Sequence, residues 1–312
     1  MINFRYHVVS ITAVFLALAI GLVLGTAALN GPAADHLKNQ VSSLNNRNSQ
    51  LRERSGQLQN QVNSQADFVQ EAAPMLLAGR LTGRTVLVVS TDTTDRDYRD
   101  AVVEMLRKSG ATLTGKLQLR EPFTNPARDA ALQDLGTRLV PAGVTSMPNN
   151  GVGVETASAL LAVTLVSGVS ETVPESGRTS ILAGFTSLGV VSEDGADITK
   201  PAEAVVVVAG PAATDQDADQ RNHALLTILQ QFDRVAKYMV LAAPQATGSG
   251  NPVASIRRDD SLAKHISTVD NVSSPEGQVV TSLALAEQFR GKTGHYGSGD
   301  GSTARVPDLQ AQ

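Results

Sequence analysis

Few side chains in this chain could perform chemistry, and they lie far apart. There is no cysteine among the 312 residues, which excludes thiolate metal sites, disulfides and cysteine nucleophiles. No two of the five histidines have the HxxxH or HExxH spacing that places two ligands on one helix face, and the five methionines form no MxxM or MxM cluster typical of Cu(I) sites. No P-loop, GxGxxG fingerprint or GxSxG elbow is present. The residue spacing therefore predicts no catalytic residue and no cofactor, and leaves any metal ligand unknown.

Two aspartates are candidates for a binding or catalytic site. Asp92 and Asp270 each follow a predicted strand, and ligands of open α/β sheets bind outside the carboxyl ends of the strands. We take the two as candidates for a crevice there. The alternative is that they are turn or capping residues, a common use of aspartate.

Composition narrows the class of protein. The chain carries 26 Lys and Arg against 30 Asp and Glu, a net charge of -4, and aromatic residues are only 4% with no tryptophan. Nucleic-acid binding relies on basic residues that neutralise phosphates and on aromatic stacking platforms. We therefore expect no nucleic-acid partner.

The elements that carry these residues begin with a membrane helix. The segment from Val8 to Leu29 has no charged side chain, and as a helix it would be roughly 33 Å long, enough to cross a bilayer. Arg5 and His7 precede it and no acid does, so the positive-inside rule places the following chain outside the cytoplasm. Small residues near Gly25 also allow a cleaved signal peptide, although this apolar stretch is longer than usual for one.

Small residues recur inside this segment at every fourth position. Such a stripe lets two helices approach closely in a membrane, and it predicts helix association. The alternative is that alanine and glycine are simply common in membrane helices. The stripe consists of Ala13, Ala17, Gly21 and Gly25.

A helical stalk is predicted after Asn30-Gly31-Pro32. Apolar residues alternate in steps of four and three, with leucine at heptad position d and valine or Asn48 at position a, a pattern typical of a parallel two-stranded coiled coil. The alternative is a single amphipathic helix that packs on its own domain. The stripe and the heptads together indicate a homodimer or small homo-oligomer. The predicted seam is Leu37, Val41, Leu44, Asn48, Leu51, Leu58 and Val62, with Val69 continuing position a.

The remainder predicts one α/β domain. Short β-branched runs such as 85–90 and 204–209 alternate with helical segments, which indicates a mostly parallel sheet with helices on both faces. The predicted organisation is a membrane anchor at 1–31 with its span at 8–29, a stalk at 32–73, an exported α/β domain at 79–296, and a disordered Gly/Ser/Asp-rich tail at 297–312.

The amino-terminal sequence also resembles a known family. The run Met1-Ile-Asn-Phe-Arg-Tyr-His7, the following Val8-Val9-Ser10 and apolar segment, and the late Gly294-His-Tyr-Gly297 are similar to the MctB-type copper-transport proteins of mycobacteria and other actinobacteria. The resemblance covers about residues 1–297. It implies a cell-envelope protein linked to copper efflux, described as a pore-forming outer-membrane protein, with copper as its cargo.

The resemblance and the residues agree only in part. A single helix cannot enclose a water path, and outer-membrane pores are barrels of alternating strands, so a single-helix anchor suggests the inner membrane. We expect a non-enzymatic membrane protein that takes part in copper export, with a channel only if several copies contribute. The alternatives are a scaffold that recruits envelope partners, and an enzyme with its site near Asp92 and Asp270.

Overall fold

The computed structural model describes residues 4–29, 31–168, 173–194, 198 and 200–308. The chain divides into two units, Met1–Gln65 and Ala66–Gln312. The first contains helix α1 (Phe4–Leu29) and most of helix α2 (Pro32–Leu77). The second contains the end of α2 and the α/β domain.

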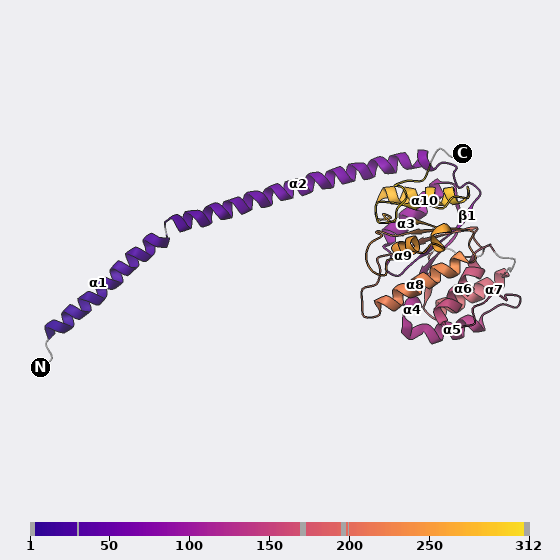
Figure 1. Cartoon of the computed structure of the whole chain (residues 1–312), viewed down its shortest axis with the longest axis horizontal. Helices are drawn as coiled ribbons and strands as arrows, with labels where there is room; N and C mark the ends of the chain where they lie inside the picture. Colours follow the sequence, from indigo (N-terminus) through magenta and orange to yellow (C-terminus); the bar gives the residue numbers. More distant parts are fainter. Residues whose placement is uncertain (1–3, 30, 169–172, 195–197, 199, 309–312) are drawn as a thin grey trace. The chain divides into compact units, whose positions relative to one another are not determined.

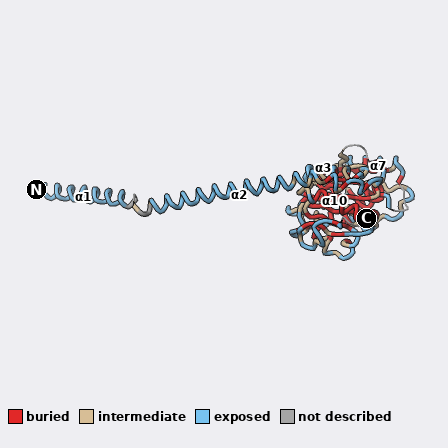
Figure 2. Tube along the Cα trace, turned by 90° about the horizontal axis from the view of Figure 1, so that it is seen from above, coloured by how far each residue is buried: buried red, intermediate tan, exposed pale blue. Residues whose placement is uncertain are grey.

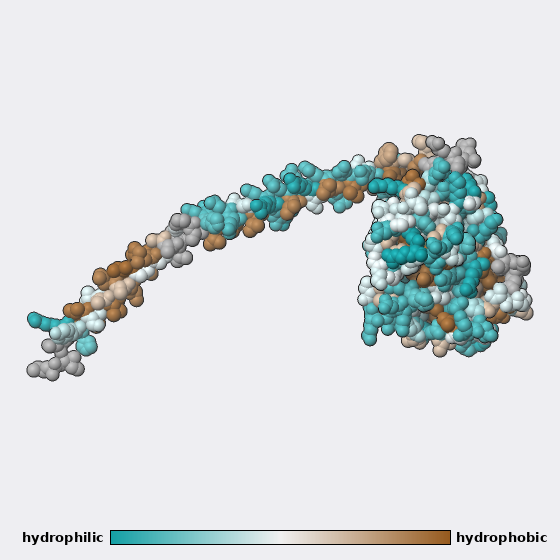
Figure 3. All heavy atoms as spheres, in the orientation of Figure 1, coloured by the Kyte–Doolittle hydropathy of each residue, from teal (hydrophilic) through white to brown (hydrophobic). Residues whose placement is uncertain are grey.

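Helix α1 meets the length and composition expected of a membrane span. Its residues Phe4–Ala27 form an apolar helix long enough to cross a bilayer. The side chains described there are exposed, as is the blue trace of α1 in Figure 2. Figure 3 shows apolar residues along its length. Such a surface is unfavourable in water and matches a lipid environment.

The α/β domain contains one sheet. Among the described residues its strand order is β3-β2-β1-β4-β5-β6-β7, and every neighbouring pair is parallel except β2 with β3. This confirms the predicted fold class. The strands are β1 (Thr85–Ser90), β2 (Thr112–Leu119), β3 (Val191–Glu193), β4 (Ala204–Val208), β5 (Tyr238–Ala242), β6 (Ile266–Val269) and β7 (His295–Tyr296).

Helices cover both faces of this sheet. In Figure 1, α3 and α10 lie on one side of it and α4 to α8 on the other. The helical segments are α3 (Arg96–Lys108), α4 (Glu121–Thr124), η1 (Pro126–Arg128), α5 (Asp129–Arg138), α6 (Gly153–Leu165), α7 (Glu175–Ser187), α8 (Ala218–Asp233), α9 (Pro252–Arg258), η2 (Leu262–Lys264) and α10 (Pro275–Gln288).

Alternate residues of each strand supply two separate cores. In β1, Leu87 and Val89 belong to the larger core with α6 and α8, whereas Val86 and Val88 belong to the core under α3 and α10. Both faces are covered, and the central strands have buried apolar runs, as parallel strands usually do: all of β4, and Val86 to Val89 of β1. This arrangement fixes the loops at the carboxyl ends of β1 and β4.

The end of α2 packs against its own domain. Ala73 and Leu77 are buried with Met105 of α3 and Leu283 of α10, and Val69 packs against this cluster. Val69 therefore makes an intramolecular contact. At this end of α2 the structure matches the alternative prediction, a helix that packs on its own domain. The helix also continues through Pro74 to Leu77, beyond residue 73, where the predicted stalk ends.

The carboxyl-terminal tail differs from the disorder expected for it. The backbone N–H groups of Ser298 and Gly299 donate to Asp270, and the carbonyl of Asp300 accepts from Arg257. These bonds give residues 297–308 a defined path. Residues 309–312 lie outside the described residues, as do 1–3 and 30 of the predicted anchor.

Candidate functional site

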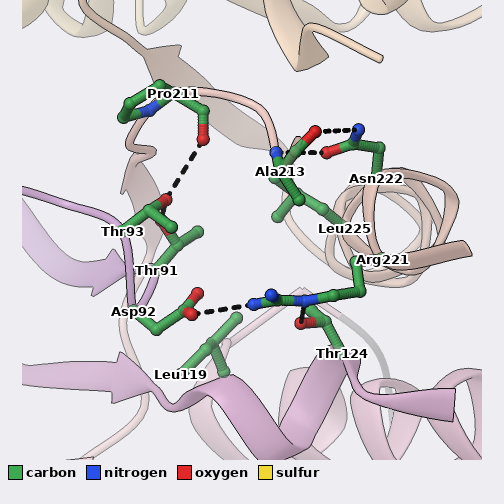
Figure 4. A pocket seen from close by; sticks show the side chains of 10 residues that line it. All are labelled: Thr91, Asp92, Thr93, Leu119, Thr124, Pro211, Ala213, Arg221, Asn222 and Leu225. Carbon is green, nitrogen blue, oxygen red and sulfur yellow. Dashed lines mark hydrogen bonds and ion pairs between the residues drawn. The ribbon is translucent and has the colours of Figure 1, made fainter. Parts of the chain in front are cut away.

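The sheet order places a crevice between β1 and β4. The chain leaves β1 toward β2 on one side and returns to β4 on the other, so their carboxyl ends form the topological switch point at which open α/β sheets bind ligands. Figure 4 shows the pocket there. Its lining residues come from the loops after β1 and β4, the end of β2, α4 and α8: Thr91, Asp92, Thr93, Leu119, Thr124, Pro211, Ala213, Arg221, Asn222 and Leu225.

Asp92 lies in this pocket and is paired with Arg221. An Nη of Arg221 lies 2.9 Å from a carboxylate oxygen of Asp92, and its other Nη lies 2.6 Å from Asp215. Figure 4 shows the guanidinium reaching across to Asp92, with Thr124 beside it. One cation thus joins the β1 loop to the β4 loop, and it balances the charge of Asp92.

The electrostatics of Arg221 favour this bridging role. Burial by itself would lower the pKa of the guanidinium, but the hydrogen bond to Asp215 and the charges of Asp92 and Asp215 outweigh it and raise that pKa. Arg221 therefore stays charged and stays paired. An ion pair that ties two loops together is a positioning element.

Asp270 occupies a different and more enclosed position. Its carboxylate lies 2.8 Å from an Nη of Arg257, and both side chains are only 2% exposed. Arg257 also donates to Thr268, to the carbonyl of Tyr296 and to that of Asp300. Asp270 in turn accepts two backbone N–H groups of the tail. This network fastens the tail to the end of β6.

The two candidate carboxylates do not form a pair. Asp92 follows β1 and Asp270 follows β6, with β4 and β5 between them. At about 4.8 Å between neighbouring strands, the two positions are roughly 14 Å apart along the sheet edge. Carboxylates that share acid–base work on one bond need to lie within about 5–10 Å. The geometry gives no support to the enzymatic alternative.

A second cavity adjoins the switch point, with a volume of about 400 Å³. Gly210 lets the backbone approach closely there, because a Cβ at this position would lie 2.1 Å from the carbonyl oxygen of Thr93. The cavity is large enough for a small ligand, and the polar groups of its lining residues are a phenol, an amide, a hydroxyl and a carboxylate. It is lined by Thr93, Asp95, Tyr98, Gly210, Pro211, Pro244 and Gln245.

Metal-binding groups do not converge in the described part of the chain. No group of three or more His, Asp or Glu side chains there could hold a metal ion. The nearest approach is His265, whose Nδ1 lies 3.5 Å from Asp233. Burial raises the pKa of Asp233, and the neighbouring His265 opposes this shift. A single imidazole beside one carboxylate is too small a ligand set for a closed copper site.

The predicted association surfaces are exposed in the first unit. The alanines and glycines of the α1 stripe are exposed, and nothing lies within 4 Å of a Cβ placed on Gly21 or Gly25. The leucines and valines of the α2 seam from Leu37 to Val62 are 55–65% exposed. In the part of the chain that the structure describes, both surfaces are therefore accessible to a partner helix.

Comparison with known proteins agrees with the amino-terminal resemblance. The family described as "Copper transport outer membrane protein, MctB" matches residues 1–307. The chain belongs to this MctB family. Relatives named "Copper transporter MctB" occur in Mycobacterium tuberculosis and Mycobacterium bovis, each 27% identical, and in Mycobacterium leprae, 28% identical. Each alignment covers 97% of this chain and 98% of the relative.

Membership of the MctB family confirms the resemblance predicted from residues 1–26 and 291–297. The names of these relatives describe transport, which points to a role other than catalysis and to association with a membrane. The match covers residues 1–307 and therefore includes α1 and α2 as well as the α/β domain.

Sequence reasoning identified the aspartates of the MctB-family domain but missed the arginines that pair with them. Arg221 lies within α8, and Arg257 near the end of the short α9, where each resembles an ordinary solvated charge. The only local sign that an arginine is paired inside the domain would be its position on an apolar face of a helix. Arg257 offers it weakly, because it stands next to the buried Ile256.

Proposed function

We propose that this protein takes part in copper efflux from the cell as a membrane-anchored, non-catalytic component of the envelope, with its α/β domain outside the cytoplasm. The family and the names of the relatives support the copper role. The single apolar helix α1, with Arg5 and His7 on its amino-terminal side, supports the anchor and its orientation.

The observation that carries the mechanism is the exposed stripe of α1. One helix cannot enclose a path for an ion, so conduction requires several copies or a partner. Ala13, Ala17, Gly21 and Gly25 lie four residues apart and leave space for the backbone of a second helix. We propose that copies of the chain assemble in the membrane through this stripe, and that a pore, where one forms, belongs to the assembly.

Gly21→Leu tests this mechanism, with Val23→Leu as the matched control off the stripe. A leucine at Gly21 pushes apart helices that meet there, because close backbone contact is all that the stripe offers. We expect Gly21→Leu to lower the molar mass of the detergent-solubilised chain in light scattering, and Val23→Leu to leave it unchanged.

The cellular assay measures copper content and copper tolerance. A strain that lacks the gene should accumulate copper, the wild-type chain and Val23→Leu should restore normal content, and Gly21→Leu should restore it only in part. Unchanged copper content in the deletion strain would overturn the copper role. Full rescue by a monomeric Gly21→Leu protein would overturn the assembly.

A scaffold is the second candidate function, and the exposed seam of α2 favours it, since such a surface recruits another helix. In that case the chain supports a copper exporter without handling copper itself. Calorimetric titration of the full chain in detergent with Cu(I) and Cu(II) separates the two. Saturable binding would favour direct transport, and its absence would favour the scaffold.

A further inference from the structure

The free portion of α2 is a helix that needs a partner. It is rich in Asn and Ser, which are poor helix formers, and Gly56 lies within it. Its seam leucines and valines are more than half exposed. Helices of this composition depend on packing of their apolar face for stability. A second helix on the seam would supply that packing.

The charges beside the seam determine which helix fits. In a coiled coil the residues that follow each d position (e) and precede each a position (g) flank the seam and set the choice of partner. Between Leu37 and Gln65 all basic residues occupy these flanks, and the single acidic residue, Glu53, lies at position f on the outer face. The basic residues are Lys38 and Arg52 at e, and Arg47 and Arg54 at g. The other e and g positions are Gln or Asn.

A second copy of this chain fits the flanks poorly. In a parallel pair, each g residue faces the e residue five positions later in the partner, which sets Arg47 against Arg52 of the other copy. This contact occurs twice by symmetry, and like charges across a seam disfavour pairing. Neither flank holds a carboxylate that could compensate within the pair. The flanks thus select against the homomeric stalk that the heptads alone suggest.

We propose that the α2 seam from Leu37 to Val62 binds a helix of a different protein whose own e and g positions are acidic. Charge complementarity on both flanks and leucine packing along the seam define that partner. Its helix ends before Val69, because Val69 packs against the α/β domain. This interaction goes beyond the copper role, and its test does not depend on copper.

The narrow α2 seam suits a partner helix better than a lipid surface. Helices that lie in a membrane interface carry a wide apolar face with large residues such as Phe and Trp. The apolar face here is at most two positions wide per heptad: its apolar residues are Leu and Val, and position a is polar at Asn48 and Ser55. Such a narrow seam matches the knobs-into-holes contact of one partner helix.

Two synthetic peptides test the proposal against the full chain in detergent. Both keep the a and d residues of the segment 33–65; one has Glu at every e and g position, and the other keeps the native residues. We expect the acidic peptide to bind at least tenfold more tightly in fluorescence anisotropy, with the advantage shrinking as salt rises from about 0.05 to about 0.5 M, since salt screens exposed charges.

Charge reversal in the protein provides the matched variants. The double substitution Arg47→Glu and Arg52→Glu should abolish the preference for the acidic peptide, and Glu53→Lys on the outer face should leave it unchanged. Equal or tighter binding of the native-sequence peptide would overturn the proposal in favour of a second copy. Displacement of the acidic peptide by phosphatidylglycerol vesicles would overturn it in favour of a lipid surface.

Discussion

Replacement of Asp270 by asparagine should destabilise the α/β domain strongly. The side chains of Asp270 and Arg257 are both 2% exposed, so water solvates the guanidinium poorly once the carboxylate loses its charge. Asp270→Asn keeps the size but replaces one acceptor oxygen by an NH2 donor, so it removes the charge and at least one of the hydrogen bonds that Asp270 accepts from Arg257, Ser298 and Gly299. It leaves a buried cation without a counter-charge, which is more costly than the loss of one hydrogen bond.

The magnitude follows from the enclosure of the pair. Breaking a buried ion pair by removing one partner costs about 3–5 kcal/mol. For domains of about 150–250 residues, each kcal/mol shifts the melting temperature by about 2–4 °C. Asp270→Asn should therefore lower it by about 6–20 °C. The tail should also loosen, because Ser298 and Gly299 donate to the same carboxylate.

Scanning calorimetry of the full chain in detergent, with limited trypsin digestion at Arg305, measures both effects. Asp134→Asn is the matched control, since Asp134 and Arg138 pair on the surface with both side chains 67% exposed; we expect a shift of less than about 2 °C. Replacing both partners, Arg257→Met with Asp270→Leu, should recover much of the loss. A shift for Asp270→Asn as small as that of the control would refute this account of the pair.

Two further predictions concern pH and topology. Burial, together with the charge of Arg257, lowers the pKa of His295, so the unfolded chain takes up a proton there more readily than the folded chain. The stability of the fold should therefore decrease as the pH drops through about 6.5. In thermal melts His295→Gln should reduce this loss of stability, whereas His223→Gln, at an exposed position, should not. A reporter that is active only in the cytoplasm should stay silent when fused after Tyr296, and a strong signal would reverse the orientation inferred from Arg5 and His7.

Much of the α/β fold could be predicted because its signals are local. The apolar run of β4 carries its meaning within a few positions, and the structure confirms it as a strand. Asp95 and Ser274, which accept backbone N–H groups at the starts of α3 and α10, are signals of the same local kind. Helix α7 and strand β3 were missed because Gly and Pro interrupt the pattern around them. The disorder expected of the tail was wrong for residues 297–308, since composition records only that a segment is polar and cannot show a partner elsewhere.

The partners of the two candidate aspartates illustrate why a site is harder to predict than a fold. Arg221 lies 129 positions from Asp92 in the sequence, and the contact exists only because β4 folds beside β1. Periodicity places residues on a face, but it does not say which charges meet across loops. Once these contacts form, both aspartates are neutralised within the domain, one between two loops and the other beneath the tail.

The exposed α1 stripe and α2 seam lie on the helices of the first unit, where periodicity is informative. The α1 stripe is a property of spacing alone, and so is the basic flanking of the α2 seam. The two surfaces also differ in chemistry: the stripe is uncharged and suits a copy of itself in lipid, whereas the seam is positive on both sides and suits an acidic helix in water. The two proposals together describe a chain that joins its own copies in the membrane through α1 and a different protein through α2. Such a division explains how a family member with a single span could serve transport through assembly.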